Sequence, residues 1–304
     1  MTKKRSFSYA KYGYLFCIPF VLAFLIFHFY PTIRTVLLAF TDCKGLGNTS
    51  MNFLKSDVFK NFRTILKNET FRTSLKNTVL IWTCNFIPQI VFALLFTAWF
   101  TSRRNKIRGQ GFFKVVFYLP NIITAATVAI LFNCLFAYPV GPINDLLQSL
   151  GLRTSAFYFT NDTTASRLIV AFIQFWMWYG YTMIILISGV LGINPEIFEA
   201  ADIDGANGWQ TFWQVTMPNL RSIIVYMLIT SLIGGLSMYD IPKMFNNGNP
   251  ANSTLTTSVF IYNQAFSGSY LYARAAAASM LLFLLIGVCS IFVFIMTRDR
   301  KEVR

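Results

Sequence analysis

Residues 78–100 read TVLIWTCNFIPQIVFALLFTAWF, an apolar run of 23 residues that contains no charged side chain. A helix of about 20 mainly apolar residues is long enough to cross the hydrocarbon core of a bilayer. The run therefore predicts a transmembrane helix. Five further runs have a similar length and composition, so we expect an all-α, polytopic membrane protein whose six spans cover residues 12–30, 78–100, 112–138, 168–193, 223–241 and 275–296.

The composition of the whole chain supports this class of protein. Of its 304 residues, 55% are hydrophobic, 17% are aromatic and only 12% are charged, and the mean hydropathy is +0.52. Because about a quarter of the residues of a soluble domain are charged, these values exclude an ordinary soluble enzyme, a disordered chain and a disulfide-rich secreted module. We expect residues 1–304 to form a single transmembrane domain.

The net charge of +14 predicts contact with membrane lipid and no contact with nucleic acid. Lysines and arginines lie in the gaps between apolar runs, where they can meet anionic headgroups, and no basic face is left for nucleic acid. Basic residues next to spans favour the cytoplasmic side. This rule places both termini and the link between spans two and three in the cytoplasm. The basic residues are Lys3, Lys4, Arg5 and Lys11 at the amino terminus, Arg103, Arg104, Lys106, Arg108 and Lys114 in the link, and Arg298, Arg300, Lys301 and Arg304 at the carboxyl terminus.

One segment argues against that orientation. Residues 41–77 would be extracellular, yet they carry seven basic and three acidic side chains. Apolar residues recur in this segment at roughly helical spacing, which is typical of one or two amphipathic helices on a membrane surface. A solvated basic loop is the alternative. The apolar residues are Phe59, Phe62, Ile65, Leu66, Phe71 and Leu75.

Few residues are suited to catalysis or to coupling with an ion gradient. His28 is the only histidine, so neither a His-based metal site nor Ser–His catalysis is predicted. The sequence contains no G-x-x-x-x-G-K-[ST] phosphate loop for ATP, and no acidic pair lies inside a span to couple protons or sodium. We therefore expect a chain without catalytic or metal-binding residues, which takes its energy from a partner.

The connection between spans four and five, residues 194–220, carries helix signals. Asn194 suits the N-cap and Pro195 the first helical position, which predicts a short helix to about Ile203. Gly205 then permits a turn through positive φ. A second short helix is expected at Trp209, Phe212, Trp213 and Val215, ending at Pro218. Such a pair of helices could insert into a partner's groove as a knob, and a surface-lying linker is the alternative.

The same connection resembles the EAA loop of bacterial ABC importer permeases. Glu199-Ala200-Ala201 is followed after three residues by Gly205, and Met217-Pro218 supplies the hydrophobic residue and proline about a dozen residues later. Nearly the whole chain resembles the maltose/glycerol-3-phosphate class of these permeases, through residues 14–42, 75–78, 117–121, 239–242 and 257–262. Residues 246–250 depart from the usual Thr-Gly-Gly-Gly-Pro-like turn, which leaves the conformation of that loop open.

The resemblance implies a type I ABC importer permease fold and a role in a sugar (oligosaccharide) importer of the cell membrane. It implies a second homologous permease, two ATP-binding subunits that hold ATP and Mg, an extracellular solute-binding protein, and no cofactor in this chain. A permease for glycerol-phosphate or another non-sugar solute is the alternative within the family, and a stand-alone secondary transporter lies outside it. Coupling to the ATP-binding subunits is expected from Glu199, Ala200, Ala201, Asp204, Gly205 and Pro218.

Polar and aromatic residues within the spans predict the transport path. Lipid exposure of such groups is costly, so they should face the bundle interior. Gln174, Trp178 and Tyr181 share one face of span four at i, i+4 and i+7. Aromatic rings can pack on the C–H faces of sugars, and amides can bond their hydroxyls. The expected path residues are Asn121, Gln174, Trp178, Tyr181, Ser231, Gly235 and Met238, although small residues such as Gly235 also serve helix packing.

Overall fold

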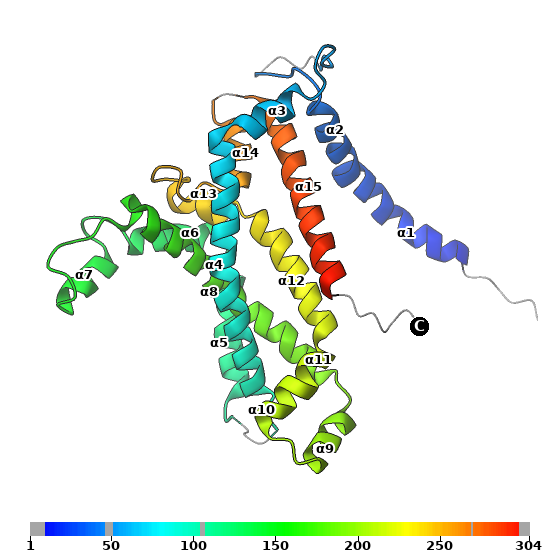
Figure 1. Cartoon of the computed structure of the whole chain (residues 1–304), viewed down its shortest axis with the longest axis vertical. Helices are drawn as coiled ribbons and strands as arrows, with labels where there is room; N and C mark the ends of the chain where they lie inside the picture. Colours follow the sequence, from blue (N-terminus) through cyan, green and yellow to red (C-terminus); the bar gives the residue numbers. More distant parts are fainter. Residues whose placement is uncertain (1–9, 46–50, 104–106, 269, 298–304) are drawn as a thin grey trace, which may run out of the picture. The chain divides into compact units, whose positions relative to one another are not determined.

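The computed structural model describes residues 10–45, 51–103, 107–268 and 270–297, and these are predominantly helical (Figure 1). Within them, the only extended pairing is an isolated bridge between Thr41 and Phe53. Of the basic residues used for orientation, Lys3, Lys4, Arg5, Arg104, Lys106 and those from Arg298 onward lie outside the described residues. The helices are α1 (Ala10–Phe24), η1 (Leu25–Phe29), α2 (Tyr30–Leu38), α3 (Lys60–Lys67), α4 (Glu69–Phe100), α5 (Gln110–Ile122), α6 (Ala125–Leu135), α7 (Pro142–Ser149), η2 (Phe159–Asn161), α8 (Thr163–Leu191), α9 (Pro195–Ile203), α10 (Gly208–Gln210), η3 (Thr211–Thr216), α11 (Met217–Asn219), α12 (Arg221–Leu236), α13 (Asp240–Asn246), α14 (Thr257–Phe266) and α15 (Tyr272–Thr297).

Five helical segments of the described chain are long and apolar enough to cross a membrane, and a bent pair of helices would make a sixth. The all-α, polytopic class predicted from the sequence is thereby confirmed. The five segments are Lys11–Leu38, Glu69–Phe100, Thr163–Leu191, Arg221–Asn246 and Tyr272–Thr297, and the bent pair is Gln110–Ile122 with Ala125–Leu135.

The third predicted span, residues 112–138, is not one continuous helix. Its two halves, α5 and α6, meet at an angle of 91°. Ile123 and Thr124 have extended backbone angles between them, and the Thr124 hydroxyl accepts the backbone N–H of Thr127 at 3.3 Å as the N-cap of α6. This cap satisfies a donor that a new helix start leaves unpaired, so the break is stable within an apolar run.

The structure divides into two compact units, Met1–Lys67 with Ile261–Leu281, and Asn68–Phe260 with Leu282–Arg304. In the first unit, buried alanines Ala39, Ala276 and Ala277 form a small core against which Phe62 of α3 packs. The Asn61 side-chain amide donates to the carbonyl oxygens of Ala39 and Thr41, at 2.8 and 2.9 Å. The apolar face of α3 therefore packs against protein.

In its described part, residues 41–45 and 51–77, the expected amphipathic segment contains one short surface helix of its own, α3. Ile65 on its inner face is 1% exposed, whereas Arg63 and Lys67 are exposed to solvent. Phe71 and Leu75 belong instead to the first turns of α4, which begins at Glu69 after the N-cap Asn68. The Asn68 side chain accepts the Phe71 N–H at 3.0 Å and starts the long helix nine residues before the apolar run itself.

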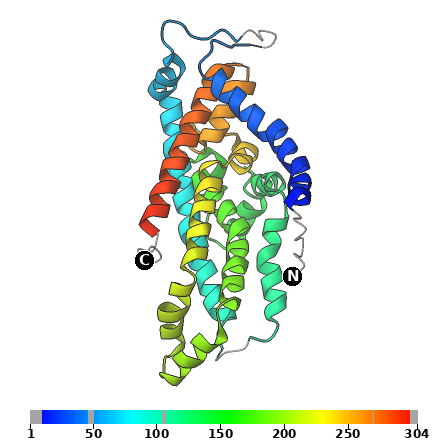
Figure 2. The same cartoon turned by 90° about the vertical axis from the view of Figure 1, so that its right-hand side faces the viewer.

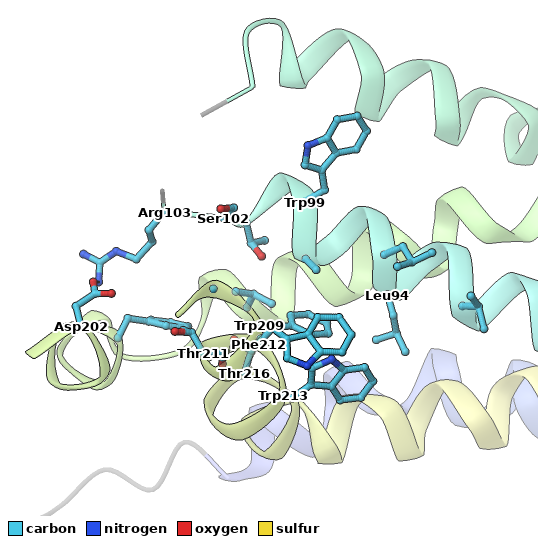
Figure 3. Close-up of a pocket in the computed structure, with 17 residues that line it drawn as sticks. Leu94, Trp99, Ser102, Arg103, Asp202, Trp209, Thr211, Phe212, Trp213 and Thr216 are labelled. Atoms are coloured by element: carbon cyan, nitrogen blue, oxygen red, sulfur yellow. Dashed lines mark hydrogen bonds and ion pairs between the residues drawn. The ribbon is translucent and has the colours of Figure 1, made fainter. Parts of the chain in front are cut away.

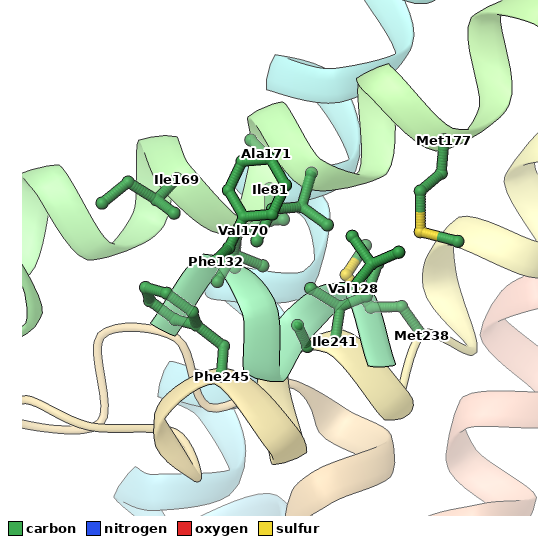
Figure 4. Packing of buried hydrophobic residues seen from close by; sticks show 12 residues of the cluster. Ile81, Val128, Phe132, Ile169, Val170, Ala171, Met177, Met238, Ile241 and Phe245 are labelled. Atoms are coloured by element: carbon green, nitrogen blue, oxygen red, sulfur yellow. The ribbon is translucent and has the colours of Figure 1, made fainter. Parts of the chain in front are cut away.

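The second unit is built on α4 and α8, which pack along one another and are joined by α5, α6, α12 and α13. Figure 4 shows one of its two main hydrophobic clusters, where side chains of α6, α8 and α13 meet. Val128, Ile173 and Phe245 in this cluster are almost fully buried. The other cluster includes Met183, Leu186 and Leu220 and ties α8 to the start of α12. These contacts fix the helices that carry both candidate sites.

Candidate functional site

The 194–220 segment begins with the helix that the sequence predicts. The Asn194 side-chain oxygen accepts the Glu196 N–H at 3.2 Å, and α9 runs from Pro195 to Ile203. Gly205 has a φ of +77°. The Gly205 N–H donates to the Asp202 carbonyl at 3.2 Å, and the next N–H donates to the Ala201 carbonyl at 3.0 Å. This pair of bonds is a Schellman motif with glycine at the left-handed position.

The second half of the segment differs from the prediction. A capping box between Asn207 and Gln210 starts α10, with bonds of 2.8 and 2.9 Å. The chain then continues through the π-helical η3 and α11, and only a turn at Leu220 separates these from α12. The prediction that Pro218 ends the helix is therefore wrong. The Met217 N–H donates to the Phe212 carbonyl in the π pattern. Such a local bulge makes room in the helix for Pro218, which has no N–H to donate.

Residues of the EAA pattern lie on an exposed surface of α9. Glu199, Ala200, Asp204 and Gly205 are exposed, whereas Ala201 is buried at 8%. Ile203 is 85% exposed at the end of the helix. Apart from Ala201, these residues therefore contribute little to the core of the chain.

Arg103, which follows α4, pairs with two carboxylates of α9. Its guanidinium nitrogens lie 3.6 Å from Glu199 Oε1 and 3.8 Å from Asp202 Oδ2, and Figure 3 shows the side chain reaching toward Asp202. All three side chains are about half exposed, so each pair contributes at most about 1 kcal/mol. The contact orients α9 relative to the end of α4. The stability of the fold depends mainly on the apolar contacts.

A cavity of about 480 Å³ lies between the end of α4, α9 and η3. Its lining includes Leu94 and Trp99 of α4 and, from the 194–220 segment, Trp209, Phe212 and Trp213, which lie together on one side of α4 while the Trp99 side chain points away from them (Figure 3). In Figures 1 and 2, α9 and α10 lie at the end of the second unit where α4 ends. The rings of the segment contact one another, with Trp209 and Phe212 at centroid distances of 5.5 Å from Trp213.

A second cavity, of about 420 Å³, lies between α4, α8, α12 and the start of α13; we call it the central cavity. Six of the seven predicted path residues line it, namely Gln174, Trp178, Tyr181, Ser231, Gly235 and Met238. Trp178 and Tyr181 meet edge to face, with ring centroids 5.6 Å apart. The structure thus brings residues of α8 and α12 together that are about 50 positions apart in the sequence.

Asn121 is the one predicted path residue that is not among those lining the central cavity. Its side-chain amide donates to the Met177 carbonyl of α8 at 3.2 Å. The bond joins α5 to α8 two residues before the break that ends α5. Asn121 therefore has a structural contact, because its amide donates to a helix carbonyl oxygen that can accept a second hydrogen bond.

Sequence reasoning missed the contribution of α4 to the central cavity. Trp82, Asn85 and Gln89 all line it, and the Gln89 amide donates to the Thr182 hydroxyl at 2.7 Å. A signal for this face was present in the sequence, since four of the six positions spaced by four residues along it are polar, and residues at this spacing share one helical face. The buried positions of this stripe are Asn77, Ile81, Asn85, Gln89, Ala93 and Thr97.

The lining of the central cavity has a definite chemistry. Its lining residues include aromatic side chains and side chains with uncharged amides or hydroxyls, and Asp240 is the only carboxylic acid among them. No lysine, arginine or histidine is among the lining residues that the structure describes. Among the described residues, no group of three or more His, Cys, Asp or Glu could hold a metal ion. The cavity is therefore suited to an uncharged, hydroxylated ligand with an apolar face.

Known proteins with similar sequences are transport permeases. The lactose transport system permease protein LacF of Rhizobium radiobacter is 30% identical over 95% of both chains. The multiple sugar-binding transport system permease protein MsmF of Streptococcus mutans is 30% identical over 92% of this chain and 93% of its own. The arabinooligosaccharides transport system permease protein AraP of Bacillus subtilis is 31% identical over 93% of this chain and 88% of its own.

The fold also matches solved structures. A chain of a bacterial ABC transporter involved in the import of the acidic polysaccharide alginate superposes with a TM-score of 0.78 at 23% identity, over 95% of both chains. A second structure, of an alginate ABC transporter in complex with an alginate pentasaccharide-bound periplasmic protein, gives a TM-score of 0.77 at 24% identity, over 94% of this chain and 93% of that one. The expected importer permease fold is thereby confirmed.

The family model described as "Binding-protein-dependent transport system inner membrane component" matches residues 72–300, which include the 194–220 segment and the central cavity. The match covers most of the chain, and the relatives above match more than nine tenths of it. The chain therefore belongs to the family of inner membrane components of binding-protein-dependent transport systems.

Proposed function

We propose that the chain is one of two membrane-spanning subunits of an ATP-driven importer of neutral oligosaccharides. The observation that carries this proposal is the central cavity, where Trp82, Trp178 and Tyr181 lie among the amides of Asn85 and Gln174. Such a mixture suits sugar rings, which present both hydroxyls and an apolar C–H face. The names of the relatives, which refer to lactose, multiple sugars and arabinooligosaccharides, support the same substrate class.

The absence of basic side chains from the lining of the cavity favours a neutral substrate. A carboxylate or phosphate taken out of water is strongly unfavourable unless a cation or several donors pair with it. Within the described lining the only formal charge is the carboxylate of Asp240, which would repel an anion. The cavity therefore disfavours glycerol-phosphate and acidic sugars as substrates in the part of the path that this chain supplies.

We further propose that the 194–220 segment couples the chain to two ATP-binding subunits, which hold ATP and Mg. The exposed groups of Glu199, Ala200 and Ile203 supply the docking surface, and Gly205 sets the turn that presents it. Because the chain lacks a phosphate loop of its own, hydrolysis must occur in a partner. A second permease completes the path, and a solute-binding protein delivers the sugar on the opposite side.

The orientation predicted from the basic residues is tested by labelling single cysteines in a cysteine-free background. Arg108→Cys, in the link between α4 and α5, should react with a membrane-impermeant maleimide only after the membrane is permeabilised. Lys60→Cys, on exposed α3, should react in intact cells. Labelling of position 108 in intact cells would reverse the assignment of both termini to the cytoplasm.

The substrate class is tested by uptake into proteoliposomes that contain the chain, the second permease, the ATP-binding subunits and the solute-binding protein. We expect ATP-dependent uptake of at least one of lactose, raffinose and arabinotriose. Trigalacturonate and glycerol-3-phosphate should be neither taken up nor able to compete. Uptake of only the two anions would overturn the proposal, and ion-driven uptake by the chain alone would favour a secondary transporter.

A further inference from the structure

One aromatic side chain of the central cavity, Trp82 of α4, is held in place from several sides. Its indole N–H donates to the Ser231 hydroxyl of α12 at 3.3 Å. Its ring stacks on Phe86 with centroids 5.4 Å apart and planes inclined by 18°. Trp82 also packs against the buried cluster that contains Ile81 and Val128. A side chain with these contacts on two helices has little freedom to change rotamer.

Gly235 of α12 makes the position of this indole possible. A Cβ atom at residue 235 would lie 1.9 Å from Trp82 Cδ1, 2.7 Å from Nε1 and 2.8 Å from Cγ. These distances are far below van der Waals contact, so the pyrrole edge of the indole occupies the space that any larger side chain would need. Even alanine at position 235 would push the ring away from α12.

Amides and hydroxyls that could bond the hydroxyls of a sugar line the same cavity as Trp82. Asn85 and Gln89 follow it along α4, and Gln174 and Tyr181 of α8 belong to the same cavity. An aromatic ring packs on the apolar C–H face of a pyranose or furanose while such groups bond the hydroxyls. A ring whose orientation is fixed before binding loses little entropy when the ligand arrives, which favours binding.

We propose that Trp82 is the platform on which one ring of the transported saccharide packs, and that Gly235 sets how much of the cavity this platform leaves open. Ser231 fixes the orientation of the platform through the indole N–H. The proposal rests on the proposed function, because it assumes a saccharide in the central cavity. It adds the residue that contacts the sugar ring and the residue that limits the length of saccharide accepted.

The test uses the complete complex in proteoliposomes with neutral probes of two, three and four rings, namely lactose, raffinose and stachyose. Trp82→Ala should lower the maximal uptake rate about tenfold, as expected for the loss of one aromatic contact of about 1.4 kcal/mol, and Trp82→Phe should keep part of it. Gly235→Ala should reduce uptake of the longest transported probe more than that of the shortest, because the displaced indole narrows the cavity.

Combining the two changes separates a steric effect from a general loss of function. If the methyl group at position 235 acts only by moving the indole, Gly235→Ala should have little further effect in the Trp82→Ala background, so the two effects would not add. Trp99→Phe, on the same helix but outside the central cavity, and Gly287→Ala in α15, where a Cβ meets no atom within 4 Å, are matched controls that should retain the wild-type length profile.

The outcomes distinguish this proposal from the function on which it rests. If the wild-type complex takes up none of the three probes, both fall together. If it takes them up and Trp82→Ala and Gly235→Ala leave rates and length profile unchanged, the platform is overturned while the importer function stands. If Trp82→Ala fails to assemble, the length profiles of Trp82→Phe and Gly235→Ala decide, and an unchanged profile in both rejects the proposal.

Discussion

Replacing Gly180 by valine should strongly reduce the amount of folded chain in the membrane. A Cβ at this position of α8 would lie 1.9 Å from the Phe117 carbonyl oxygen, 2.5 Å from its carbon and 3.0 Å from Tyr118 Cα. All three atoms belong to the backbone of α5, which cannot rotate away as a side chain can. The two helices would have to separate, and overpacking of this kind costs at least about 1–3 kcal/mol.

Size-exclusion chromatography of the detergent-extracted chain, with its thermal midpoint, measures this effect. Gly180→Val should give a several-fold lower monodisperse yield and a lower Tm. Separation of the helices would also break the adjacent bond from Asn121 to the Met177 carbonyl. The control is Gly287→Val, at a helical glycine whose Cβ would meet no atom within 4 Å. Equal yield and Tm for the two variants would show that α5 and α8 do not approach as closely as described.

Glu199→Lys and Gly205→Val should leave the chain in the membrane but uncouple transport from ATP hydrolysis. Valine at a φ of +77° adopts a conformation that β-branched residues avoid, at a cost of about 1–3 kcal/mol. That strain would displace the end of α9 and the exposed Ile203. Lysine at position 199 would meet Arg103, whose guanidinium now lies 3.6 Å from the carboxylate, so like charges would replace the pair. We expect uptake to fall at least tenfold.

Two further variants identify the cause. Gly151 also has a positive φ, +68°, with no atom within 4 Å of its Cβ position, but it follows α7 and lies far along the chain from the 194–220 segment. Gly151→Val introduces the same backbone strain and should retain uptake. The triple variant Arg103→Glu, Glu199→Lys and Asp202→Asn restores opposite charges without placing a carboxylate against Asp202, so it should recover transport if Glu199 orients α9, and should stay inactive if Glu199 contacts the ATP-binding subunit directly.

Local signals in the sequence were sufficient for α9 and its cap. Asn194, Pro195 and Gly205 each have a conformational preference that acts within a few residues, and the observed bounds of α9 agree with the prediction. The apolar runs likewise predicted the membrane-spanning segments, because length and hydropathy decide whether a helix can cross a bilayer. Both kinds of signal depend on neighbours in the sequence and need no knowledge of tertiary contacts.

Features that depend on contacts between helices could not be predicted in this way. The break at Ile123 and Thr124 follows Pro120 and Asn121 closely, but the apolar run continues on both sides of it, so length and hydropathy alone predicted one span. Asn121 is a polar residue within a predicted span, as a path residue should be, yet its amide donates to a backbone carbonyl of α8. Trp82 lines the central cavity because Gly235, some 150 residues away, leaves room for its ring. Such a pair becomes visible only when the helices are in place.

The most direct test of coupling through residues 194–220 is the ratio of sugar moved to ATP hydrolysed. It is measured in proteoliposomes that hold the complete complex. One side of the membrane has the solute-binding protein and a neutral saccharide that the wild type transports, and the other side has ATP. We predict that the wild type and Gly151→Val share one ratio, whereas Gly205→Val and Glu199→Lys hydrolyse ATP with little or no uptake or lose the ATP-binding subunits on purification. Wild-type assembly and a wild-type ratio in both Gly205→Val and Glu199→Lys would contradict the assignment and leave the segment as a linker between α8 and α12.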